Sequence, residues 1–166
     1  MKKLITLAFL TLLSTFASTS SFAQTENHAG SNCVRRSGGA IAYDFHGAVY
    51  NTNYTSKSWV LCNVPHTDFD GWLNAGEING GWFRAVDRNT SFDVKCRFRA
   101  QGVNNNGSIA AYYGGTRGTT GFGTQGQRVN LPGVSEHSHT GYVLACELPP
   151  RTSIGVSRLY TYQVRQ

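Results

Sequence analysis

The sequence lacks the motifs of the common catalytic and metal centres. It contains no H-E-x-x-H zinc motif, no G-x-S-x-G nucleophile elbow, and no glycine-rich loop followed by Lys-Ser or Lys-Thr. Acidic residues are few, nine Asp and Glu against 15 Lys and Arg. A glycosidase needs two carboxylates at a defined separation, and a small chain with so few acids is poorly supplied for that chemistry. We therefore expect a protein that is not an enzyme, and the sequence implies no cofactor.

Long apolar segments are missing as well. An apolar run over 4–13 is too short for a permanent membrane span, which needs about 20 apolar residues. Two lysines precede this run, and a polar stretch ending in Ser-Phe-Ala follows it, so we expect 1–23 to be a cleaved signal peptide. An uncleaved anchor is the alternative, which the polar stretch disfavours. The remaining chain of about 140 residues has the size of one domain, secreted or periplasmic and without a transmembrane anchor.

Four cysteines follow the expected cleavage site: Cys33, Cys62, Cys96 and Cys146. Export to an oxidising compartment predicts two disulfides from this even number. Zinc ligation is the alternative, but no two of these cysteines have the short spacing of zinc sites. Three connectivities are possible, and strand positions favour Cys33–Cys62 and Cys96–Cys146.

Alternation of apolar and charged residues predicts the clearest strand, 91–100. Phe92, Val94, Cys96 and Phe98 alternate there with four charged residues, which is typical of a strand with one buried and one wet face. A helix is excluded, because the charges would surround its apolar stripe.

The segment 141–148 is apolar on both faces and is expected to be a central strand. Further strands are predicted at 40–45, 57–62, 81–87, 108–113, 127–131 and 156–165. The glycine-rich segment 114–126 is either a mobile loop or a glycine-bulged edge. Trp59 and Trp82 lie within predicted strands and are expected in the core.

About eight short strands, two disulfides and no helix of ten residues predict an all-β fold. We expect a single-domain, jelly-roll-like β-sandwich over 33–166, with a closed barrel as the alternative. The polar residues 24–32 are expected to form a flexible N-terminal lead.

Several sequence pieces resemble a group of small exported bacterial proteins of unassigned function with a two-disulfide, all-β framework. The pieces are C-V-R-R-S-G-G-A-I at 33–41, V-L-C at 60–62, A-V-D-R-N at 85–89, D-V-K-C at 93–96, A-C-E-L-P-P-R at 145–151 and Y-T-Y-Q-V-R at 160–165. The resemblance implies the same cysteine pairing and the all-β class. It implies no activity and no functional residue.

The loop 66–77 is one candidate ligand site. It combines Trp72 with the carboxylates of Asp68, Asp70 and Glu77, a mixture that sugar-binding sites use for ring stacking and for accepting hydroxyl hydrogen bonds. A calcium loop is disfavoured, because Trp72 occupies a ligand position. The alternative is a surface loop in which Asp and Gly make turns and Trp72 covers the core edge.

Two histidines, His137 and His139, are weak candidates for a metal site. At this spacing they would share one face of a strand, with His66 or His46 as a third ligand. A solvated turn before the following strand is the alternative.

Arginines dominate the third candidate site. Lys95, Arg97 and Arg99 lie on the wet face of the predicted strand 91–100, and Arg84 and Arg88 lie on or beside the strand before it. If these two strands pair, the arginines form a basic patch for an anionic polysaccharide or phosphate. A solvated sheet face is the alternative. Nucleic acid is disfavoured, because the net charge is low and the arginines are not interleaved with exposed aromatics in a known module.

The leading hypothesis is therefore an exported, non-enzymatic binding module for carbohydrate or another anionic component of the cell envelope. A structural or self-assembling matrix protein is the first alternative, and a small metal-dependent hydrolase is the second. The sequence leaves the oligomeric state open.

Overall fold

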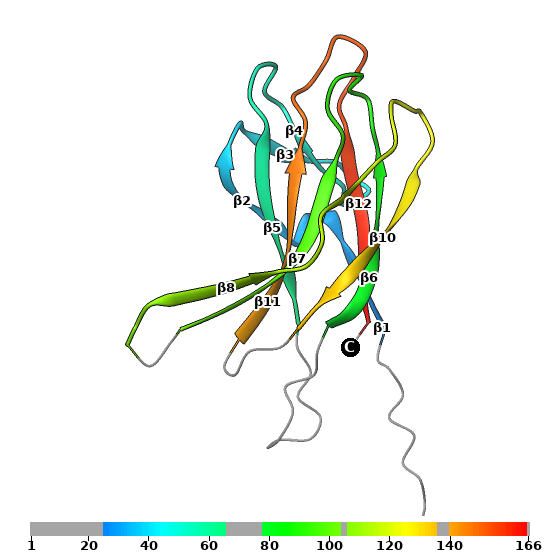
Figure 1. Cartoon of the computed structure of the whole chain (residues 1–166). Helices are drawn as coiled ribbons and strands as arrows, with labels where there is room; N and C mark the ends of the chain where they lie inside the picture. Colours follow the sequence, from blue (N-terminus) through cyan, green and yellow to red (C-terminus); the bar gives the residue numbers. More distant parts are fainter. Residues whose placement is uncertain (1–24, 66–77, 104–105, 136–139, 166) are drawn as a thin grey trace, which may run out of the picture.

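The protein is a β-sandwich of two antiparallel sheets (Figure 1), and its computed structural model describes residues 25–65, 78–103, 106–135 and 140–165. Sheet A has the order β10 (Gln127–Val134), β6 (Ile78–Val86), β12 (Arg158–Arg165), β4 (Val49–Asn51), β3 (Ile41–Tyr43), with β1 (Thr25–Ala29) also paired to β12. Sheet B has the order β2 (Cys33–Gly38), β5 (Ser58–Val64), β11 (Thr140–Leu148), β7 (Lys95–Val103), β8 (Ile109–Tyr113), with β9 (Arg117–Gly118) also paired to β7. The predicted all-β sandwich is confirmed. No helix in these four ranges is long and apolar enough to cross a membrane.

The N-terminal lead is not flexible over its described part. Residues Thr25–Ala29 form strand β1, which pairs antiparallel with β12, and Gly30–Asn32 form a 3-10 turn. The expectation of a disordered lead over 24–32 is therefore wrong for 25–32. The polar composition misled the prediction, because this segment is held by backbone pairing with β12 and not by burial of apolar side chains.

The core lies between the two sheets and is built by the period-two alternation of the strands. Its large, fully buried side chains come from both layers, with Phe83 and Tyr162 from sheet A and Phe98 and Leu144 from sheet B. Gly81 allows this close approach: a Cβ atom there would lie 2.0 Å from the Gln163 carbonyl oxygen and 2.9 Å from the Phe98 ring. A side chain at this position would push β6 away from β12 and from the opposite sheet.

Both disulfides have the predicted connectivity. Cys33 is bonded to Cys62 and Cys96 to Cys146. Each bond joins two directly opposed residues of neighbouring strands, β2 with β5 and β7 with β11. The two bonds therefore link strands within sheet B and do not connect the two sheets.

The predicted strand 91–100 begins later than its alternation suggests. Val94, Cys96 and Phe98 are buried as predicted, but β7 starts at Lys95, and Phe92 is exposed with the Lys57 ammonium 4.5 Å from its ring centre. The buried Asp87 carboxylate accepts hydrogen bonds from the amides of Asn89 and Val94 and so holds the residues before β7.

The glycine-rich segment is an edge of sheet B over part of its length. Arg117–Gly118 form the short strand β9 against Lys95 and Cys96 of β7, and the amide of Gly114 donates to the Phe98 carbonyl. The structure supports a sheet edge for Arg117–Gly118, whereas 119–126 lie outside the strands.

Candidate binding face

The outer face of sheet B is the surface on which the candidate site lies. Inward positions of its strands belong to the core, so the alternate residues point outward. Pairing registers align these outward residues in rows across the sheet. We call this surface the Tyr113 face, and its central residues are Trp59, Leu61, Val143, Ala145, Glu147, Lys95, Arg97, Arg99 and Tyr113.

Two arginines converge on one aromatic ring of this face. The guanidinium carbon of Arg97 lies 4.1 Å from the ring centre of Tyr113, and that of Arg99 lies 5.5 Å from it. Tyr113 pairs with Arg99 across β7 and β8, so the contact follows from the register. Cation–π contacts of this kind orient the ring, which remains half exposed.

Neither arginine has its hydrogen-bonding capacity satisfied. The Nε atoms of Arg97 and Arg99 are buried and have no hydrogen-bond acceptor, and Arg99 is only 8% exposed. No carboxylate of the described segments forms an ion pair with either side chain. A buried guanidinium without an anionic partner costs several kcal/mol of solvation, by the general estimate for buried ions.

The acidic residue of the Tyr113 face is already neutralised. Glu147 is the one acid in the strands of sheet B, and its Oε1 lies 2.6 Å from Nζ of Lys57. Glu147 also stands directly opposite Lys95 in the β11–β7 register. Among the described residues, no carboxylate therefore compensates the positive charge of Arg97 and Arg99 on this face.

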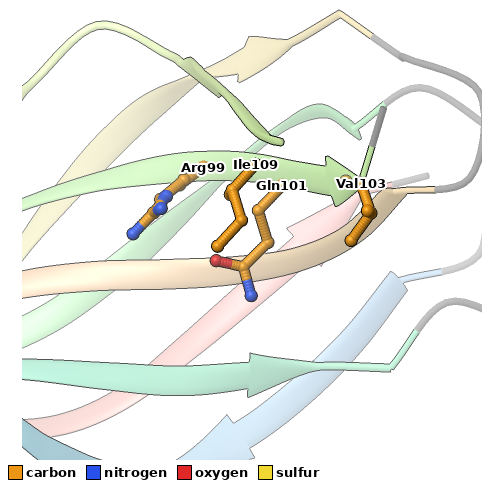
Figure 2. A pocket seen from close by; sticks show the side chains of 5 residues that line it. Arg99, Gln101, Val103 and Ile109 are labelled. Carbon is orange, nitrogen blue, oxygen red and sulfur yellow. The ribbon is translucent and has the colours of Figure 1, made fainter. Parts of the chain in front are cut away.

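A pocket opens beside Arg99, at the end of the Tyr113 face where β7 continues into β8. It has a volume of about 310 Å³ and is lined by Arg99, Gln101, Gly102, Val103 and Ile109. Figure 2 shows the four labelled side chains in a row along the two strands, on one side of the sheet. This volume falls at the lower end of the range for small-molecule sites.

On the outer face of sheet A, one cluster of polar side chains is satisfied internally. The indole N–H of Trp82 donates to Oε1 of Gln163 at 2.5 Å, and the Gln163 amide donates to Oδ1 of Asn27 at 2.9 Å. The guanidinium of Arg128 lies 4.8 Å from the Trp82 ring centre.

The predicted basic patch is corrected by this arrangement. Arg84 lies on β6 in sheet A, whereas Arg97 and Arg99 lie on β7 in sheet B, so the two strands do not pair. Arg84 is exposed on the opposite side of the sandwich. Sequence proximity of the two strands misled the prediction.

Both tryptophans within strands also differ from expectation. Trp59 and Trp82 are partly exposed and occupy outward positions, one on each sheet, so the expectation that they lie in the core is wrong. The sequence carries a signal for this, since Trp59 alternates with the buried Ser58, Val60 and Cys62.

The two other predicted sites lie outside the described residues. These sites comprise Asp68, Asp70, Trp72 and Glu77 of the candidate sugar loop, and His66, His137 and His139 of the candidate metal site. Within the ranges that are described, no group of three or more His, Cys, Asp or Glu side chains could hold a metal ion.

Comparisons with known proteins give similarity at the level of fold. No protein-family model and no curated protein matches the chain. A family two carbohydrate esterase from Cellvibrio japonicus superposes with a TM-score of 0.45 and 9% identity over 87% of this chain and 34% of its own, so the chain spans about a third of that protein. A low-affinity xylan-binding module, CBM86, from Roseburia intestinalis superposes with a TM-score of 0.46 and 11% identity over 86% of this chain and 96% of its own. These similarities are too weak to bear on the ligand, and the proposals below rest on the geometry of this chain.

Proposed function

We propose that the protein is an exported, non-enzymatic binding module that holds a carbohydrate chain on the Tyr113 face. The observation that carries this proposal is the half-exposed ring of Tyr113 beside two arginines whose Nε–H groups have no acceptor. Aromatic rings pack on the apolar C–H face of a sugar, and guanidinium N–H groups donate to sugar oxygens. The sheet holds these groups on rigid strands, which lowers the entropic cost of binding.

The Tyr113 face is long enough for several sugar rings. Trp59 lies four residues along the strand direction and three strands across from Tyr113, a diagonal of about 20 Å. The surface between the two aromatic residues carries the short side chains of Val143 and Ala145. A chain lying across this surface would meet an aromatic ring near each end, which favours an oligosaccharide over a single sugar.

A glycan array with the mature, oxidised protein tests the proposal directly. We expect specific hits that weaken at least tenfold in Tyr113→Ala and clearly in Trp59→Ala, since each variant removes a stacking surface. Trp82→Ala, which removes the tryptophan of the opposite outer face, is the matched control and should bind as the wild type does.

Two results would overturn this assignment. A blank array under all conditions would remove carbohydrate binding altogether. Loss of binding in Trp82→Ala with full binding in Tyr113→Ala would move the site to sheet A. Repeating the array with calcium and with a chelator asks whether the loop 66–77 contributes a cation-dependent site.

Self-assembly is a second candidate, which one observation favours. Strand β8 is an edge of sheet B and projects from the sandwich in Figure 1, and Ile109 on β8 and Val103 on β7 are 75% and 64% exposed. An exposed, apolar sheet edge can pair with another chain. Sedimentation velocity at rising protein concentration is the test: association that Ile109→Lys abolishes supports this candidate, and a strict monomer removes it.

A further inference from the structure

The pocket beside Arg99 has a chemical character that a neutral sugar does not explain. Its polar end holds the Arg99 guanidinium, 8% exposed and with Nε lacking an acceptor, together with the Gln101 amide. Its other wall is formed by the apolar side chains of Val103 and Ile109. A ligand that fits must combine an anionic group with an apolar surface.

The positive charge at this point is reinforced, because Arg97 and Arg99 project from the same face of β7. Residues two apart on a strand are about 7 Å apart along the chain, so the two guanidinium groups repel each other unless an anion lies near both. Both groups contact the Tyr113 ring, whose electron-rich face offsets part of this repulsion. No carboxylate among the described residues takes the place of an anion here.

We infer that this pocket binds the carboxylate of an acidic sugar, a uronate residue within a polysaccharide chain. A guanidinium fork pairs with a planar carboxylate through two parallel hydrogen bonds, which suits Arg99 better than a neutral hydroxyl does. The sugar ring carrying the carboxylate packs its C–H face on Ile109 and Val103, and the chain continues along the Tyr113 face. This inference rests on the proposed function and names the substrate class of its site.

The carboxylate assignment is tested by comparing glycans that differ only in charge. We would measure binding of polygalacturonate, of the same polymer with its carboxylates methyl-esterified, and of neutral xylan by isothermal titration calorimetry. We expect polygalacturonate to bind at least tenfold more tightly than the esterified polymer. Dextran sulfate is included because a sulfate ester offers the same negative charge with a tetrahedral geometry, and we expect it to bind more weakly.

Two arginine variants locate the effect. Arg99→Met keeps the length of the side chain and removes its charge, and should remove the preference for polygalacturonate over its ester. Arg99→Lys retains the charge without the fork and should recover only part of the preference. Arg84→Met removes the same charge from the outer face of sheet A and is the matched control, with binding unchanged.

The outcomes separate this inference from the proposed function. Equal affinity for the charged and the esterified polymers, with no effect of Arg99→Met, overturns the carboxylate site and leaves glycan binding intact. Absence of binding to every glycan overturns both. Tighter binding of dextran sulfate than of polygalacturonate, or salt-sensitive binding of duplex DNA that Arg99→Met abolishes, also overturns the assignment to uronates.

Discussion

The buried carboxylate of Asp87 is predicted to hold one end of the sandwich together. It follows β6 directly, is fully buried, and accepts hydrogen bonds from the amides of Asn89 (3.0 Å) and Val94 (3.2 Å) and from the hydroxyls of Thr119 (2.5 Å) and Ser157 (2.8 Å). These four donors belong to the segments that lead into β7, follow β9 and lead into β12. One side chain therefore connects segments that are remote in sequence and belong to both sheets.

Replacing this carboxylate should be strongly destabilising. In Asp87→Ala the Val94 amide keeps Thr119 Oγ1 as an acceptor at 3.0 Å, but the Asn89 amide and the two hydroxyls lose theirs. Each of these three stranded buried donors costs about 1–3 kcal/mol, so we expect a loss of at least about 3 kcal/mol of unfolding free energy. For a domain of this size that lowers the melting temperature by about 10 °C.

Thermal unfolding followed by circular dichroism measures this effect. Asp87→Asn keeps the shape but replaces an acceptor with a donor, and should cost less than Asp87→Ala. Asp93→Asn is the control for charge removal, because this half-buried acid lies in the segment that the network holds. Melting of Asp87→Ala at the wild-type temperature would show that these hydrogen bonds contribute no net stability, and would refute the reasoning.

Three further perturbations have expected outcomes. Reducing both disulfides, which close loops of 29 and 50 residues, should cost several kcal/mol at about 2–4 kcal/mol for each bond, and an unchanged melting temperature in reductant would contradict this. Burial raises the pKa of Tyr162 to about 12, an effect that the Asn32 side chain partly offsets. Because this pKa exceeds that of tyrosine in the unfolded chain, the free energy of unfolding should fall as the pH rises from 10 to 12. Denaturation by guanidinium chloride at several pH values measures this fall, which should be smaller in Tyr162→Phe. Arg99→Met should unfold at the same temperature as the wild type or a few degrees higher, since it removes an unpaired buried charge, and a decrease of more than 5 °C would argue for a structural role.

The sequence was sufficient to predict the fold class, the disulfide pairing and most strands. Period-two alternation placed Cys96 and Cys146 on buried faces, and the structure confirms that they oppose each other in β7 and β11. Strand β1 was missed because its pairing with β12 is made by the backbone, which leaves no pattern in a polar segment. Phe92 was wrongly expected in the core because the alternation in the sequence starts before β7 does. The residues just before Lys95 are hydrogen-bonded to Asp87 and are not part of the strand.

The candidate site was less predictable, because it depends on which strands become neighbours. Alternation put Arg97 and Arg99 on an outward face correctly, but Arg84 was expected beside them because its strand comes directly before theirs. The chain instead crosses between layers after β6, around Asp87, so the two strands belong to different sheets. Tyr113 reaches the site through the β7–β8 register, so its place beside Arg99 depends on the pairing of these two adjacent strands and not on the arginine pattern alone.

A comparison with one polar cluster of sheet A shows how the binding role proposed for Arg99 can be separated from a structural one. On sheet A, Trp82, Gln163 and Asn27 satisfy one another, so each contributes to stability without a ligand. On sheet B, Arg99 is buried without an acceptor for its Nε, an arrangement that costs folding energy. Replacing an arginine with a structural role should lower both the stability of the protein and its affinity for the ligand. Replacing an arginine that serves an anionic ligand should lower the affinity and leave the stability unchanged, because its anionic partner is present only when the ligand is bound. Measuring the melting temperature and the polygalacturonate affinity of Arg99→Met together therefore separates the two roles.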